Sequence, residues 1–158
     1  MNYYSAVLKK YAVFNGRSQR AEYWYWFLFN LIVGIILNMF GYVIGKNMAS
    51  IIILLYTLAI IIPNLAVVVR RLHDVGKSGW WLFWWFIINA VSLLVIVIIL
   101  RVFGKNSSWL LIDLFLLLIP LFLDIWLFVL LVTDSNQGEN KYGPNPKEVA
   151  INPNPLNL

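Results

Sequence analysis

The sequence has 158 residues, about the length of one domain, and carries a formal net charge of +5. Hydrophobic residues make up 61% of the chain and charged residues 12%, against roughly 45–50% and about 25% in an average soluble domain. A small water-soluble protein cannot bury that much apolar surface. The chain has no cysteine and one histidine, which excludes disulfides, cysteine nucleophiles and thiolate metal sites. The composition therefore excludes a cytosolic globular enzyme, a disordered chain and a disulfide-stapled secreted module, and predicts an integral membrane protein.

The first polar segment has the pattern of a short amphipathic helix. Apolar and aromatic side chains recur three and four positions apart, at Tyr3, Tyr4, Val7, Leu8, Tyr11 and Phe14. Lys9 and Lys10 border this stripe, and Gly16 follows as a helix stop. We expect the helix either to lie flat in the cytoplasmic headgroup layer or to pack its stripe against the loops of the bundle.

Four apolar runs are long enough to cross the hydrocarbon core of a bilayer, which takes about 20 residues. Backbone groups in lipid must be hydrogen-bonded within their own segment, so each run should be a helix. The sequence thus predicts an all-α, integral membrane four-helix bundle with an N-terminal amphipathic interfacial helix. One membrane domain covers residues 1–147, and the Pro- and Asn-rich segment 148–158 is predicted to be a disordered tail. The predicted spans cover residues 23–44, 48–69, 80–100 and 109–132.

Lysine and arginine gather on one side of the predicted spans. Nine of them precede the first span, lie between the second and third, or follow the fourth, whereas Lys46, Arg101 and Lys105 lie on the other side. The positive-inside rule then places both termini in the cytoplasm. Because these charges flank apolar spans and do not lie on a soluble module, we expect them to attract anionic headgroups and not nucleic acid.

Three polar blocks fall on this cytoplasmic side: one before the first span, one in the polar loop 70–79, and one after the fourth span. The blocks read Phe14-x-Gly16-Arg17-x-x-Arg20-x-Glu22-Tyr23-Trp24, then Arg70-Arg71-Leu72-His73-Asp74-x-Gly76-x-Ser78-Gly79-Trp80-Trp81, and Gly138-x-Asn140-x-Tyr142-Gly143-Pro144-x-Pro146. Together they resemble the bacterial membrane family called domain of unknown function 805, over the chain from about Val7 to Lys147. The resemblance implies a small integral inner-membrane protein with no assigned biochemical activity.

The convergence of the blocks predicts a surface that binds a partner protein or anionic lipid. His73-Asp74 is the one pair that could form an acid–base dyad. Adjacent residues rarely point at each other, however, and local pairing of Asp74 with Arg70, Arg71 or Lys77 is the favoured interpretation. We therefore expect a non-enzymatic protein with no catalytic residue, cofactor or metal ion, and a homo-oligomer is compatible with the sequence. The candidate binding residues are Arg17, Arg20, Glu22, Arg70, Arg71, His73, Asp74, Asn140 and Tyr142.

The fourth span contains two carboxylates, Asp113 and Asp124. A charged carboxylate in mid-bilayer costs about 2.5–3.5 kcal/mol on insertion scales and marks a candidate functional site. Asp113 lies near the outer end of the span, where Arg101 or Lys105 could meet it. Asp124 lies deeper, at nearly the depth of Asn30 on the first span, which is its predicted partner. A bundle held by polar contacts is the favoured interpretation, and a small proton- or ion-linked transporter or channel that uses Asp124 is the alternative.

Overall fold

The computed structural model describes residues 3–103 and 107–151. Their regular structure is helical, and α2, α3, α4 and α5 are each long and apolar enough to cross a membrane. The all-α fold with four candidate spans is therefore confirmed. In chain order the helices are α1 (Tyr3–Lys9), α2 (Arg20–Ile44), α3 (Lys46–Asp74), α4 (Trp80–Phe103), α5 (Ser107–Val132) and α6 (Pro146–Ile151).

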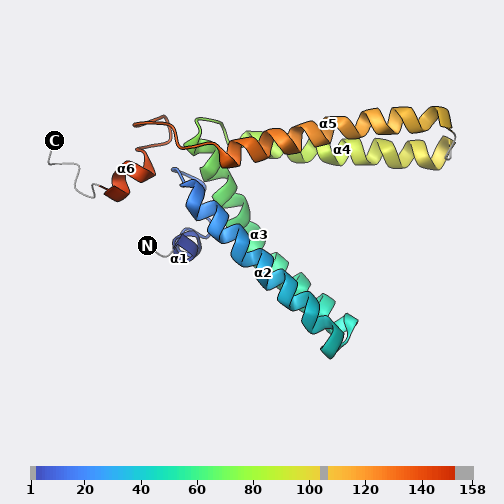
Figure 1. Cartoon of the computed structure of the whole chain (residues 1–158), viewed down its shortest axis with the longest axis horizontal. Helices are drawn as coiled ribbons and strands as arrows, with labels where there is room; N and C mark the ends of the chain where they lie inside the picture. Colours follow the sequence, from blue (N-terminus) through green and yellow to red (C-terminus); the bar gives the residue numbers. More distant parts are fainter. Residues whose placement is uncertain (1–2, 104–106, 152–158) are drawn as a thin grey trace.

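The four long helices form two hairpins, α2–α3 and α4–α5, that diverge from a shared end (Figure 1). We call this shared end, where α2 and α4 begin and α3 and α5 finish, the polar end. Leu72 of α3 packs there against Leu127 and Leu131 of α5 in a buried cluster. The sequence did not predict how the four helices pair. In the structure they pack along their length as two pairs, and the two pairs join at the polar end.

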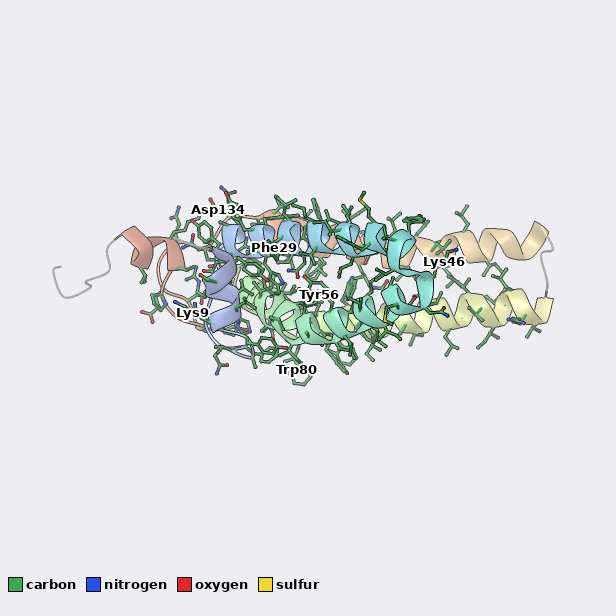
Figure 2. The ribbon with its side chains drawn as sticks, turned by 90° about the horizontal axis from the view of Figure 1, so that it is seen from below. Lys9, Phe29, Lys46, Tyr56, Trp80 and Asp134 are labelled. Atoms are coloured by element: carbon green, nitrogen blue, oxygen red, sulfur yellow. The ribbon has the colours of Figure 1, made fainter. Side chains whose placement is uncertain are left out.

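Helix α1 lies across the α2–α3 hairpin near the polar end (Figure 2). Its Tyr4 ring stacks on Trp26, with the ring centroids 5.0 Å apart. Val7 is fully buried against Trp26 and Val67. The stripe therefore packs against the same chain, as one of the two expectations had it, but against the spanning helices α2 and α3 and not against loops. The helix is shorter than the stripe predicted and ends at Lys9.

Two predicted boundaries were wrong. Residues 70–74 belong to the last turns of α3 and not to a loop, because no glycine or proline lies between Pro63 and Gly76. Gly76 takes a left-handed conformation with φ +74°. Residues 148–151 are helical and not disordered, because the Asn145 side chain accepts a hydrogen bond from the Lys147 backbone N–H (3.0 Å) at the start of α6. Residues 152–158 of the predicted tail lie outside the described part of the chain.

Proline at position 63 frees a backbone carbonyl inside α3. A proline has no N–H, so it cannot donate to the carbonyl four positions earlier, which here belongs to Ala59. The Tyr11 hydroxyl, from the segment after α1, donates a hydrogen bond to this carbonyl. Backbone groups in a membrane need such partners, so the N-terminal segment completes the hydrogen bonding of α3.

We predict that Tyr11→Phe lowers the free energy of unfolding by about 1 kcal/mol, because the Ala59 carbonyl loses its donor. In a Pro63→Ala background the restored N–H supplies that bond, so the same substitution should cost less than half as much. Unfolding of the purified protein in detergent micelles, followed by tryptophan fluorescence, measures both values. An equal loss in the two backgrounds would contradict this assignment.

Candidate functional site

The carboxylate of Asp74 is the centre of a buried polar network at the polar end. Asp74 is fully buried. One of its oxygens accepts a hydrogen bond from Arg17 Nε at 2.9 Å. The other accepts from Arg71 Nη1 and, at 2.7 Å, from Ser135 Oγ. Two guanidinium groups and a hydroxyl therefore neutralise and solvate the carboxylate in place of water.

Arg17 connects the first polar block to the third. Besides Asp74, its guanidinium group donates to the backbone carbonyls of Asn136 (2.6 Å), Gly138 (2.7 Å) and Gly143 (3.2 Å). The side chain is almost entirely buried. Backbone carbonyls in a tight turn are good acceptors for the several donors of one guanidinium group, so Arg17 holds the segment after α5 in a fixed shape.

Arg71 joins the two hairpins by capping α5. Its Nε donates to the Leu131 carbonyl (3.3 Å) and its Nη2 donates to the Thr133 carbonyl. The last carbonyls of a helix have no partner within the helix, and the negative end of the helix dipole favours a nearby positive charge. One buried side chain of α3 therefore satisfies the end of α5.

Arg70 holds the segment between α1 and α2. Its Nη1 donates to the carbonyls of Lys10 and Val13, and its own carbonyl accepts from the backbone N–H of Ser18 (3.2 Å). Its Nε and Nη2 are buried without a hydrogen-bond partner among the described residues. The buried carboxylate of Glu22 acts on this guanidinium group electrostatically, which offsets part of the cost of burying the charge.

His73 and Asp74 have separate partners and do not form a dyad. The His73 ring stacks on Tyr142, with centroids 3.7 Å apart and planes 6° from parallel. Its Nδ1 lies 3.2 Å from the Gly16 carbonyl oxygen. The His73 backbone carbonyl accepts from the side chain of Asn140 (3.0 Å). The favoured interpretation, in which Asp74 pairs locally, is confirmed by its contact with Arg71.

Arg20 differs from the other candidate residues because it lies on the surface. Its Nε is 4.0 Å from a carboxylate oxygen of Asp134, and both side chains are more than half exposed. Lys147 also donates to Asp134, and this hydrogen bond lowers the pKa of the carboxyl group. Among exposed groups such pairs add little to stability.

The three polar blocks do meet in space, as the sequence predicted, but most of their charged groups are buried and bonded to one another. The side chains of Arg17, Arg71 and Asp74 are at most 1% exposed. Within residues 3–103 and 107–151, no group of three His, Asp or Glu side chains could hold a metal ion. The network can therefore fix the relative positions of several segments. Its buried charges are already bonded to one another, so only the exposed groups around it are available to bind a ligand.

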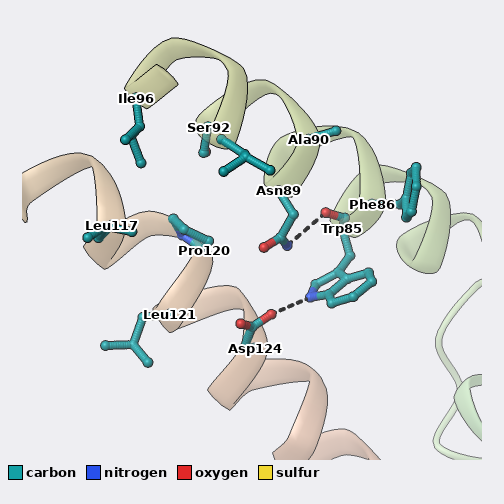
Figure 3. Close-up of a pocket in the computed structure, with 11 residues that line it drawn as sticks. Trp85, Phe86, Asn89, Ala90, Ser92, Ile96, Leu117, Pro120, Leu121 and Asp124 are labelled. Carbon is teal, nitrogen blue, oxygen red and sulfur yellow. Dashed lines mark hydrogen bonds between the residues drawn. The ribbon is translucent and has the colours of Figure 1, made fainter. Parts of the chain in front are cut away.

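The predicted contact between Asp124 and Asn30 was wrong. Asp124 accepts a hydrogen bond from Trp85 Nε1 at 2.8 Å, within the α4–α5 hairpin (Figure 3). Asn30 accepts from the Tyr56 hydroxyl at 2.6 Å, within the α2–α3 hairpin. The two residues lie on hairpins that diverge, so equal depth does not bring them together. Asp113 lies in α5, and its side chain is outside the described part of the structure.

We predict that Asp74→Asn lowers the free energy of unfolding by about 3–5 kcal/mol, because two buried guanidinium groups lose their counter-charge. The matched control is Asp134→Asn, which removes an exposed carboxylate from the same region and should change stability little. Detergent-micelle unfolding measures both variants. Equal effects of the two substitutions would show that Asp74 does not stabilise the polar end.

Comparisons with known proteins agree with this architecture. The family described as "Protein of unknown function (DUF805)" matches residues 11–106. Inner membrane protein YhaI of Escherichia coli K12 is 33% identical over 147 residues, which are 93% of this chain and 97% of YhaI. Inner membrane protein YhaH of the same strain is 29% identical over 150 residues, 93% of this chain and 98% of YhaH.

A third relative, the uncharacterized protein YiiR of Escherichia coli K12, is 31% identical over 137 residues, 86% of this chain and 87% of YiiR. No solved structure matches. The family match covers more than half of the chain and includes the first two polar blocks, so the resemblance carried by those motifs is confirmed. With its four apolar helices, the chain belongs to the DUF805 family and is an integral inner-membrane protein.

Proposed function

We propose that this protein is a non-enzymatic inner-membrane module whose polar end lies in the cytoplasm and binds anionic lipid headgroups. The observation that carries the proposal is the division of its positive charges into two groups. The motif arginines Arg17, Arg70 and Arg71 are buried and bonded internally. The remaining cationic side chains of the polar end form an exposed or half-exposed set that we call the basic rim: Lys9, Lys10, Arg20, Lys77, Lys141 and Lys147.

The buried network fixes the backbone that carries this rim. Lys10 is held through its own carbonyl by Arg70. Lys77 donates its backbone N–H to the Leu72 carbonyl (2.8 Å) in the turn after α3. Lys141 lies over the Tyr142 ring, 4.9 Å from its centroid. These three cations stand on constrained segments, so little backbone entropy is lost when a headgroup binds.

The segment around the end of α1 adds an apolar component to the basic rim. Leu8, Val13 and Phe14 are exposed large apolar side chains beside Lys9 and Lys10. A basic segment with exposed apolar residues is typical of structures that lie in the membrane interface, where the cations contact headgroups and the apolar groups reach the acyl boundary. This composition favours a lipid surface over a soluble partner protein as the ligand.

The distribution of charge also supports the proposed orientation, and the shape of the groove at Asp124 disfavours the alternative of transport. Nine of the twelve lysine and arginine residues flank the polar-end side of the spans, which by the positive-inside rule favours a cytoplasmic polar end. Transport through Asp124 is the less favoured function. The residues that line the groove around this carboxylate lie between Trp85 and Ile96 and between Leu117 and Asp124, so the groove does not run the length of the spanning helices.

We predict that the purified protein, offered equal amounts of phosphatidylglycerol and phosphatidylcholine in detergent, retains phosphatidylglycerol preferentially. Lys9→Gln with Lys10→Gln should lower the ratio of retained lipids at least fivefold, since a cation near an anionic surface contributes about 1 kcal/mol. Native mass spectrometry measures the ratio. Arg70 and Arg71 are unsuitable for this test, because their removal would disturb the buried network.

The matched control for lipid retention is Lys46→Gln with Arg101→Gln. It removes two exposed cations from the ends of the hairpins that lie away from the polar end. This variant should keep the ratio of the unsubstituted protein. An equal loss in both double variants, or no preference in the unsubstituted protein, would refute binding at the basic rim.

Single engineered cysteines test the orientation, since the natural sequence contains none. Asn15, Asn47 and Gln137 are exposed positions on opposite sides of the spans. We predict that in intact spheroplasts a membrane-impermeant maleimide labels Asn47→Cys alone, and that permeabilised cells show all three labelled. Labelling of Asn15→Cys and Gln137→Cys in intact spheroplasts would place the polar end outside the cytoplasm.

A further inference from the structure

The geometry of the α4–α5 hairpin points to a second binding site, distinct from the basic rim: a groove that takes a hydrophobic organic cation. The groove has a volume of about 620 Å³ and lies between the two helices of the hairpin. This volume is within the roughly 300–1,000 Å³ range of small-molecule sites. Figure 3 shows the groove with Asp124, Asn89 and Trp85 directed into the space between the helices. The site does not depend on lipid binding at the polar end.

The lining of the groove is mostly apolar. Ala90, Leu93, Ile96, Leu117 and Leu121 form most of its wall. Such a surface favours the body of a hydrophobic ligand, because apolar contact is made without unpaired polar groups. Its polar side chains are Ser92 and the group formed by Asp124, Asn89 and Trp85, which gives the groove one polar pole with a carboxyl group.

Asp124 sets the charge that the ligand must carry. Eight residues separate it from the end of α5, which is about 12 Å along a helix at 1.5 Å per residue. Its carboxylate is exposed in the groove and receives one hydrogen bond, from Trp85 Nε1. The described cations of the spanning helices all lie at or near helix ends: Arg20, Lys46, Arg70, Arg71 and Arg101. A positive charge on a ligand would complement the carboxylate where no described protein cation does.

Aromatic side chains favour the same class of ligand. Trp85 and Phe86 both line the groove, and the π-face of an aromatic ring attracts cations, tryptophan most strongly. The Trp85 indole N–H is directed at Asp124 and fixes the carboxylate at the pole. Asn89 donates to the Trp85 backbone carbonyl at 3.0 Å, which leaves its own amide oxygen available to a ligand with N–H groups. Carboxylate, aromatic rings and apolar wall together suit a lipophilic ammonium or phosphonium ion.

A pair of ions of equal size and opposite charge separates charge recognition from simple partition into an apolar groove. We would measure saturable binding of radiolabelled tetraphenylphosphonium and of tetraphenylborate to the full chain in nanodiscs of zwitterionic lipid. We expect saturable binding of the phosphonium cation and none of the borate anion. Equal binding of both ions, or no saturable binding of the cation, would overturn the proposal without any variant having to fold.

Two variants then locate the site. Asp124→Asn keeps an acceptor for Trp85 and removes the charge, and it should weaken phosphonium binding at least tenfold; Asp134→Asn, an exposed carboxylate outside the groove, should leave it unchanged. Ala90→Trp, which fills the groove from an exposed position on α4, should also abolish binding. Unchanged binding in Asp124→Asn or in Ala90→Trp would overturn this site.

Discussion

The structure depends on one buried carboxylate, Asp74, held between two guanidinium groups. A charge removed from water costs several kcal/mol unless it is paired and hydrogen-bonded. Arg17 and Arg71 meet that requirement, and their remaining donors bind carbonyls at the end of α5 and in the segment that follows. Arg17 and its acceptor Asn136 are 119 positions apart in the chain. The electrostatic requirement of a single side chain therefore joins both hairpins and the C-terminal segment.

Much of this fold could be predicted from the sequence, because hydropathy and helical periodicity are local properties. The four spans and the meeting of the three polar blocks belong to that part. The contacts of individual side chains were not predictable, because they are made between segments that are distant in the sequence. Whether an arginine such as Arg71 faces headgroups or caps another helix is decided by residues 60 and more positions away. The same holds for Asp124. Its depth in the span follows from the sequence, but the sequence does not say that α5 packs along α4, which brings Trp85 to Asp124.

The buried network also explains which groups are left to bind ligands. Charges inside it are mutually satisfied, so variation at those positions affects stability first. The lysines of the basic rim and the carboxylate of Asp124 lie outside the network, the lysines at the polar end and Asp124 within α5. The two proposed sites therefore use separate charges of opposite sign, and a change in one leaves the other in place.

The position of the third polar block at the C-terminal side of α5 has a consequence for biogenesis. During synthesis Arg17 and Asp74 reach the membrane surface long before Ser135, Asn136 and Gly138 have left the ribosome, so the two early residues can meet each other but not their later partners. The buried network around Asp74 is complete only when the last span is inserted and the segment after it folds back onto Arg17 and Asp74. A chain truncated before that segment would carry both hairpins with their connection incomplete, in a state that membrane proteases could distinguish from the finished protein.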